Sequence, residues 1–352
     1  MRIPLEWWKQ REARRRFMPR AKARGTGTTA KFAVVALVVI VAAAALLELR
    51  RGTGAESDVI AYAEQNRQDP VDFIEEIART RHLVVIADIP SAAAPRRFAA
   101  DAVERLAGTS GLDVVALDVP SDEQPYIDRY LATTPEDASI LLARPDAIRE
   151  GDGASRALLD LYRTVWRVNQ DLNPSRRIRI VALDHPDWPP AGAVSPSAAA
   201  QLFGLRGPHM MEVIHERVLT RSPQAVVLFL VDGLHALRSG GGRAVTGGTT
   251  PVEAVWLGTL LAERYPQGLY TILTDASASR VASPAVATYR GTAAGEALRG
   301  TDSGFALRVN ETFNSFSRSP LLVTATTGLD FSLQPRAAPV TELADGYAYF
   351  GN

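Results

Sequence analysis

The sequence predicts an α/β domain with a mainly parallel β-sheet and helices on both faces, preceded by one N-terminal transmembrane helix. Short apolar runs rich in β-branched residues alternate with longer helical stretches beyond residue 80. Strands that are apolar along their whole length are typical of a sheet buried on both faces, which is the usual form of a parallel sheet. One longer apolar segment near the N-terminus precedes this alternation and accounts for the transmembrane helix.

The predicted transmembrane helix covers residues 32–49. Phe32 to Leu47 is an unbroken run of sixteen apolar residues, and an 18-residue helix is about 27 Å long, close to the thickness of a hydrocarbon core. Residues 1–31 contain ten Lys or Arg against two Glu, a net charge of +8. Because positive flanks stay inside, we expect a single-pass protein of the cytoplasmic (inner) membrane, anchored in the lipid bilayer, with its main domain periplasmic or extracellular.

Two other interpretations of the N-terminus stay open. A short, alanine-rich apolar run is also compatible with a cleaved signal peptide. Arg14 and Arg15 resemble a twin-arginine export signal weakly, because thirteen residues separate Met18 from the apolar run. The predicted organisation is a basic cytoplasmic N-terminus (1–31), the transmembrane helix (32–49), a stalk or linking helix (50–80) and the α/β domain (81–352).

Composition excludes several classes of site. Lys plus Arg and Asp plus Glu both number 39, so the part beyond the basic N-terminus is acidic and would repel nucleic acid. The chain has no Cys, which excludes disulfides, thiolate nucleophiles and Cys-ligated zinc.

The alternation defines the expected elements in chain order. The strands are Leu83–Ala87, Val114–Leu117, Ile178–Leu183, Ala225–Val231 and Leu269–Thr274, with Leu321–Thr326 as one more. The helices are Arg96–Ala107, Pro125–Leu131, Ala154–Leu172, Met210–Arg221 and Pro251–Tyr265. The Gly-rich segment Ser239–Thr250 lacks the Lys-Ser/Thr of a phosphate-binding loop, and we expect a solvated loop, with a mobile lid as the alternative.

Each of the first five strands is followed directly by an aspartate. These are Asp88, Asp118, Asp184, Asp232 and Asp275. The carboxyl ends of parallel strands line the ligand crevice of an open sheet, so we expect several of these carboxylates to share a cleft, with His235 beside Asp232. The alternative is structural, because Asp is also a favoured turn and helix-capping residue.

The order and spacing of these motifs resemble the erythromycin esterase-like family, within the wider group that includes ChaN haem-binding and TraB/Tiki proteins. The resemblance covers about residues 80–275. The motifs that carry it are Ala87-Asp88-Ile89-Pro90-Ser91, Asp118, Arg167-Val168-Asn169 followed by the strand ending in Asp184, Asp232-Gly233-Leu234-His235, and Leu257-Gly258 with Leu260, Leu261 and Tyr265.

The resemblance implies a hydrolase in which a His base activates water beside paired Glu residues. Here Asp88 and Asp118 stand at the Glu positions, while Ser91 and Asp232 stand at His positions. A displacement of about 1 Å can cost catalysis about 100-fold. The domain is therefore expected to be either a hydrolase rebuilt around aspartates or a degenerate pseudoenzyme.

The predicted catalytic residues are His235, Asp88, Asp118 and Asp232. The predicted ligand-binding residues are Asp184, Ser91, Arg167, Asn169 and His185. A divalent cation among the carboxylates stays open, and no cofactor is named. The alternative function is a non-catalytic module that binds a small-molecule ligand, haem included, or an envelope protein. We expect His209 and His215 to have surface or packing roles, and His82 to lie at the other end of the sheet.

Overall fold

The computed structural model describes residues 57–89, 92–143, 153–190, 194–245, 251–276, 304–316, 323–324, 332–335 and 338–351. The chain divides into two compact units, residues 1–53 and 54–352, and all described residues belong to the second. Within the described ranges, no helix has the length and apolar character needed to cross a membrane. The predicted transmembrane segment 32–49 and the predicted ligand-binding residue Ser91 lie outside the described residues.

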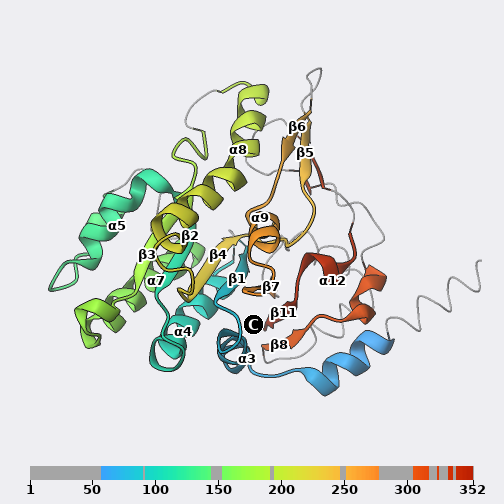
Figure 1. Ribbon diagram of the computed structural model, residues 1–352, viewed down its shortest axis with the longest axis horizontal. Helices are drawn as coiled ribbons and strands as arrows, with labels where there is room; N and C mark the ends of the chain where they lie inside the picture. Colours follow the sequence, from blue (N-terminus) through green and yellow to red (C-terminus); the bar gives the residue numbers. More distant parts are fainter. Residues whose placement is uncertain are drawn as a thin grey trace, which may run out of the picture. The chain divides into compact units, whose positions relative to one another are not determined.

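A seven-stranded sheet with the order β3-β2-β4-β1-β7-β11-β8 forms the centre of this unit (Figure 1). Its strands are β1 (Leu83–Asp88), β2 (Val114–Pro120), β3 (Arg179–Asp184), β4 (Val227–Asp232), β7 (Leu269–Ala276), β8 (Phe305–Arg308) and β11 (Gly346–Phe350). Neighbouring strands are parallel except β8, which pairs antiparallel with β11. The predicted mainly parallel sheet is therefore confirmed, and β8 and β11 extend it.

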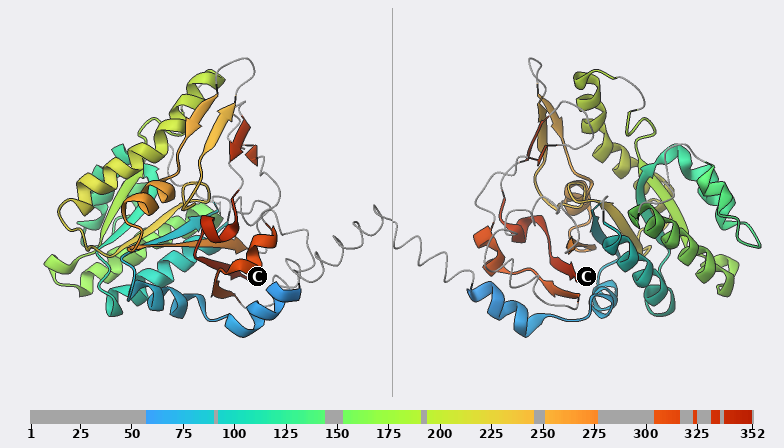
Figure 2. Two further views of the ribbon diagram at one scale, coloured as in Figure 1. Left: turned by 45° about the vertical axis from the view of Figure 1, so that its right-hand side comes forward. Right: turned by 180° about the vertical axis from the view of Figure 1, so that it is seen from behind.

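Helices cover both faces of the sheet, and each face has its own hydrophobic core. In β1, Val85 belongs to one core and Val84 and Ile86 to the other. The first core includes residues of α8 (Pro196–Ile214) and α9 (Leu257–Arg264). The second includes residues of α3 (Pro70–Ala78), α4 (Ala94–Thr109), α5 (Gln124–Leu131) and α7 (Gly153–Asp171). Figure 2 shows these helix layers from two further sides.

The described part of the predicted stalk packs onto the domain. Residues 57–66 form a helix, and α3 follows it. Val59 is fully buried in the first core and Phe73 in the second. Burying a side chain of this size contributes about 1.5–3 kcal/mol, so these residues belong to the folded unit.

A second, four-stranded sheet corrects two sequence expectations. Its order is β6-β5-β10-β9 and its pairs are antiparallel, with β5 (Gly242–Val245), β6 (Val252–Ala254), β9 (Val323–Thr324) and β10 (Ser332–Pro335). The Gly-rich segment expected as a loop contributes β5, and the start of the expected helix Pro251–Tyr265 contributes β6. Pairing between β5 and β6 overrides the local helical preference there, and the helix begins only at Leu257.

Helix α8 is longer than predicted and packs directly on this second sheet. It begins at Pro196, and its chain continues beyond Ile214 as one π-helical turn, His215–Leu219. A Cβ atom at Gly207 would lie 1.9 Å from the carbonyl oxygen of Val255. Glycine at this position is therefore what allows the helix to approach the chain that follows β6.

Candidate active site at the carboxyl edge of the sheet

Five aspartates lie at the carboxyl ends of five neighbouring strands. In the order β3-β2-β4-β1-β7 they are Asp184, Asp118, Asp232, Asp88 and Asp275. Asp88 and Asp232 are directly paired in the register of β1 and β4. The register of β2 against β3 shifts between Leu117 and Pro120, around Asp118. The sheet thus brings together Asp184, Asp118, Asp232 and Asp88, whereas Asp275 accepts a hydrogen bond from the hydroxyl group of Tyr347 at 3.3 Å.

Arg206 of α8 joins two of these carboxylates. Its Nε and Nη2 atoms lie 3.0 and 2.7 Å from Asp184 oxygens, and its Nη1 atom lies 3.0 Å from Oδ2 of Asp232. Its side chain is 6% exposed, and its guanidinium stacks 4.8 Å from the ring centroid of Trp188. Burial acts to lower the pKa of Arg206, but Asp232 and Asp184 raise it overall. Arg206 is therefore a permanent cation within the cluster.

Arg96 at the start of α4 holds Asp88. Its Nε and Nη2 atoms donate to Oδ2 of Asp88 at 3.0 and 2.9 Å. Asp88 is 4% exposed. Burial raises its pKa, and Arg96 opposes that shift without cancelling it. Neither Arg96 nor Arg206 was predicted as a site residue. For Arg206 the sequence does contain a signal, because this residue is a single Arg within the apolar stretch Leu202–Met211.

Asp118 and Asp232 are neighbours with opposite pKa shifts. The backbone N–H of Asp232 donates to Oδ2 of Asp118 at 2.8 Å. Burial, followed by repulsion from Asp232 and Asp88, raises the pKa of Asp118 well above its ordinary value.

Asp232 is held in the ionised form. Burial alone would raise the pKa of Asp232, but His235, Arg206 and the backbone N–H groups of His235 and Leu234 lower it. The pKa values of these two neighbouring carboxyl groups are therefore displaced in opposite directions, which is the arrangement that separates an acid from a base.

His235 is enclosed by aromatic side chains. Its ring centroid lies 6.2 Å from that of Phe203 and 5.9 Å from that of Trp256, and the residue is 1% exposed. Neither ring nitrogen has a hydrogen-bond partner among the described residues. Burial lowers the pKa of His235 to about 4, so the ring is neutral at neutral pH. These contacts fix the position of the ring, and the activation of water by His235 stays a prediction.

The loop that carries His235 is fixed by α9. The backbone N–H of Gly258 donates to the carbonyl oxygen of His235 at 2.7 Å. A Cβ atom at Gly258 would lie 2.5 Å from the carbonyl oxygen of Ala236. The predicted Leu257-Gly258 element therefore positions the Asp232–His235 loop through close backbone contact.

The other predicted ligand-binding residues divide between two places. His185 follows Asp184 at the carboxyl edge, and its ring centroid lies 5.1 Å from that of His209. Asn169 is buried and bonds both the N–H and the carbonyl oxygen of Ile178, at 2.7 and 2.8 Å, just before β3 begins. Arg167 is exposed and pairs with Glu104 of α4. The structure does not bring either residue to the cluster. Asn169 lies at the amino end of β3, and Arg167 points to α4 at the surface.

The described residues do not form a metal site. Among them, no group of three or more His, Asp or Glu side chains is arranged to hold a metal ion. Arg96 and Arg206 supply the positive charge that the gathered carboxylates need. The cluster therefore does not fit the divalent cation that the sequence left open.

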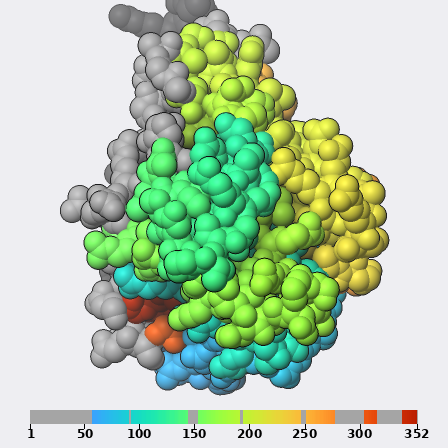
Figure 3. All heavy atoms as spheres, turned by 90° about the vertical axis from the view of Figure 1, so that its left-hand side faces the viewer, coloured from blue at the N-terminus to red at the C-terminus, as the bar shows by residue number. Residues whose placement is uncertain are grey.

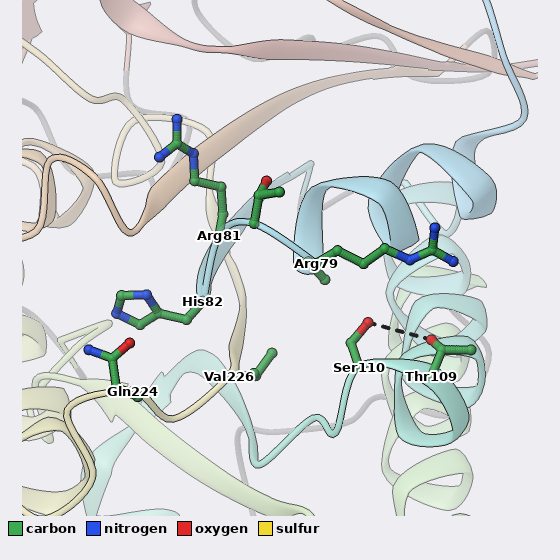
Figure 4. A pocket seen from close by; sticks show the side chains of 9 residues that line it. Arg79, Arg81, His82, Thr109, Ser110, Gln224 and Val226 are labelled. Atoms are coloured by element: carbon green, nitrogen blue, oxygen red, sulfur yellow. Dashed lines mark hydrogen bonds between the residues drawn. The ribbon is translucent and has the colours of Figure 1, made fainter.

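Two hollows lie away from the strand-end aspartates. A cavity of about 410 Å³ opens at the amino edge of the sheet and is lined in part by Arg79, Arg81, His82, Ser110 and Gln224 (Figure 4). His82 lies there, at the end opposite the aspartates, as predicted. A second hollow, of about 490 Å³, lies beside the edge strand β3 and α5, on the face shown in Figure 3.

The comparisons with known proteins identify the fold. No protein-family model and no curated protein matches the sequence. A Bacillus cereus protein of solved structure is 10% identical with a TM-score of 0.57, covering 84% of this chain and 97% of that one. A succinoglycan biosynthesis protein is 9% identical with a TM-score of 0.56 and the same coverage.

An erythromycin esterase is also among the similar structures. It is the His-to-Asn mutant of EreC in its open conformation, with a TM-score of 0.48 and 11% identity, covering 79% of this chain and 92% of that one. At such identities the likeness extends to the fold alone. The chain is thus a mixed α/β protein with the fold of the Bacillus cereus and succinoglycan biosynthesis proteins. At the carboxyl edge of its sheet lies an Asp–Arg cluster, which consists of Asp88, Asp118, Asp184, Asp232, Arg96 and Arg206.

Proposed function

We propose that the protein is an ester hydrolase whose active site is the Asp–Arg cluster, anchored to the cytoplasmic membrane by residues 32–49 with the domain outside. The observation that carries the proposal is the contact between Asp118 and Asp232, whose pKa values move in opposite directions. Such pairs of carboxyl groups divide the roles of acid and base between them. The resemblance to erythromycin esterase-like proteins supports esters and lactones as the substrate class.

The chemistry assigns each carboxyl group one proton transfer. Ionised Asp232, whose side chain is 20% exposed, accepts a proton from water as the water oxygen attacks the ester carbonyl carbon. Neutral Asp118 donates its proton to the departing alcohol oxygen. The product acid and alcohol leave, and a proton returns from Asp232 to Asp118 through solvent. A positioned proton donor of this kind contributes about 10²–10⁴-fold to the rate.

The second candidate is a non-catalytic module that binds a small ligand or an envelope partner at the same edge. It is favoured by one observation: Asp88 and Asp184 are already paired with Arg96 and Arg206, and His235 is enclosed by rings. Under this alternative the arginines and aspartates fix the shape of the edge, and no proton is transferred.

A single variant separates the candidates. Full-length protein in detergent micelles is assayed against p-nitrophenyl esters of increasing acyl length and against the macrolide lactone erythromycin. Asp118→Asn should reduce hydrolysis by about 10²–10⁴-fold, whereas Asp122→Asn, at an exposed position four residues further on, should retain the wild-type rate. Equal rates in wild type and Asp118→Asn contradict the proposal, and the lack of any hydrolysis by wild type favours the binding module.

A further inference from the structure

We infer that Ser121 and His209 form a nucleophile–base pair at the carboxyl edge, able to form an acyl-serine from an ester. The Oγ atom of Ser121 lies 3.0 Å from Nε2 of His209, across 88 positions of sequence. Contact at this distance between a hydroxyl group and an imidazole is the geometric signature of an activated serine. The inference rests on the proposed hydrolase function for its substrate, and it gives the ester a second route, through an acyl-serine, beside direct attack by water at the Asp–Arg cluster.

Ser121 occupies the place in the sheet where nucleophiles are found in many α/β enzymes. It follows β2 directly and begins the turn Ser121–Glu123, which runs into α5. A strand, then the nucleophile, then a helix is the order found in α/β-hydrolases. The Gly-x-Ser-x-Gly signature is absent, because Val119 and Glu123 stand at its two glycine positions, so the sequence motif gave no indication of this serine.

Helix α8 delivers His209 to the same edge as the aspartate cluster. His209 lies three residues after Arg206, and residues at this spacing share one face of a helix. Arg206 contacts Asp184 and Asp232, while His209 contacts Ser121. One helix face therefore spans the ends of β2, β3 and β4.

The surroundings of His209 keep its ring neutral. His185 lies beside it, and Asp184, Glu212 and Arg217 are the other charged groups that act on it. Burial, followed by His185, lowers its pKa below the ordinary value. A neutral ring with its proton on Nδ1 has the lone pair of Nε2 free to accept the proton of Ser121.

The covalent step is balanced within the pair. The Oγ atom of Ser121 bonds to the ester carbonyl carbon while its proton moves to Nε2 of His209. That proton passes to the leaving alcohol oxygen as the C–O bond breaks, which leaves an acyl-serine. Water then attacks the acyl carbon and gives its proton to His209, and the proton returns to Ser121 as the acid departs. A purely structural Ser–His contact that ties β2 to α8 would undergo none of these steps.

A serine-directed probe tests the pair without knowledge of the substrate. Full-length protein in detergent is incubated with diisopropyl fluorophosphate, a small reagent suited to a serine that is 9% exposed, and the adduct is located by peptide mass spectrometry. We expect an adduct on Ser121, formed about 100-fold more slowly in His209→Gln. Absence of the adduct, or an equal rate in a folded His209→Gln variant, overturns the inference.

A matched control and a wild-type measurement complete the test. His215 makes a comparable contact, 3.4 Å from its Nε2 atom to Oγ1 of Thr220, and His215→Gln should leave labelling of Ser121 unchanged. If His209→Gln fails to fold, the wild-type labelling rate decides. It should rise with pH through one ionisation below pH 6.5 and then level off, and a rate that does not follow such an ionisation overturns the inference.

The outcome is separable from the proposed function. If Ser121 is not labelled, while Ser121→Ala hydrolyses esters at the wild-type rate and Asp118→Asn does not, the inference fails and the proposed function stands. If Ser121 is labelled but wild type hydrolyses no ester, the proposed function fails and the Ser–His pair stands.

Discussion

The backbone N–H of Asp232 donates a 2.8 Å hydrogen bond to the carboxylate oxygen Oδ2 of Asp118. This bond joins the ends of β2 and β4. It holds the carboxyl group of Asp118, whose pKa is raised, against the Asp232–His235 loop, whose backbone N–H groups lower the pKa of Asp232. The carboxyl groups at this edge of the sheet are thus held in place by specific contacts. Asp88 contacts Arg96, Asp184 and Asp232 contact Arg206, and Asp118 accepts from the backbone N–H of Asp232.

The raised pKa of Asp118 predicts a pH-dependent effect of Asp118→Asn on stability. Above the ordinary pKa of Asp, about 3.9, the unfolded chain releases this proton while the folded chain retains it. Wild-type stability therefore decreases as pH rises from that value to the folded-state pKa. Asn carries no such proton, and its Oδ1 can still accept from Asp232. The variant should be at least as stable as wild type at pH 7, with the advantage vanishing below about pH 3.

Chemical denaturation of both proteins at pH 3, 5 and 7 measures this difference. Exposed Asp122→Asn is the control and should stay within about 0.5 kcal/mol of wild type at pH 7. If Asp118→Asn is less stable than wild type at pH 7, the carboxylate has a capping or pairing role, and the assignment of Asp118 as a proton donor is wrong.

Removing Arg206 should unfold or strongly destabilise the domain. Arg206→Met leaves the carboxylates of Asp184 and Asp232 without their cation, and breaking a buried pair costs about 3–5 kcal/mol. Arg243→Met is the control: Arg243 pairs with Glu253 at 2.6 Å, but both side chains are more than half exposed, and such a pair contributes about 0–1 kcal/mol. Thermal unfolding of the two variants should differ clearly, and similar losses would show that the buried network does not stabilise the fold.

Two glycines should respond oppositely to alanine. A Cβ atom at Gly258 meets the carbonyl oxygens of Ala236 and Leu237 at 2.5 and 2.6 Å, so Gly258→Ala should displace the Asp232–His235 loop and reduce stability by about 1–3 kcal/mol. Gly108 in α4 has open space around its Cβ position, and Gly108→Ala should stabilise the protein by about 0.5–1 kcal/mol. Denaturant midpoints measure both effects, and a Gly258→Ala variant as stable as wild type would show that the loop is not held by close approach.

The membrane topology of the proposal has its own test. Alkaline phosphatase, which is active only outside the cytoplasm, is fused after Asn352, and its activity in cells should be high. Replacing the arginines of residues 11–24 by glutamine should lower that activity, because the positive flank sets the orientation. High activity from a cytoplasm-only reporter at the same position would contradict the proposed orientation.

The sequence predicts the central sheet well because the signal there is local. Five buried strands alternate with helices, and right-handed parallel connections then place all five strand ends at one edge. The strand order, which places Asp118, Asp232 and Asp88 on the neighbouring strands β2, β4 and β1, was not predicted. The pairing of β5 with β6 depends instead on contacts between segments whose own composition favours a loop and a helix, and so it was missed.

The partners within the site were harder to predict than its location. Arg206 and His209 lie on a helix whose start the sequence did not indicate, and only the packing of α8 brings them to Asp184 and Ser121. Asn169 was expected at the site, but a helix that leads into a parallel strand ends at the amino edge of the sheet. Asn169 therefore caps the start of β3 and lies far along the strand from Asp184.

The protonation state of Asp118 tests the central claim most directly. Protein labelled with carbon-13 at its Asp carboxyl carbons is titrated by NMR, and the resonance of Asp118 is assigned by its absence from Asp118→Asn. The proposal predicts that this carboxyl group is still neutral well above pH 4, while that of Asp232, assigned in the same way, is already ionised. Ionisation of Asp118 at or below pH 4 would contradict the proposal, because no neutral acid would then be present at the carboxyl edge to complete the reaction.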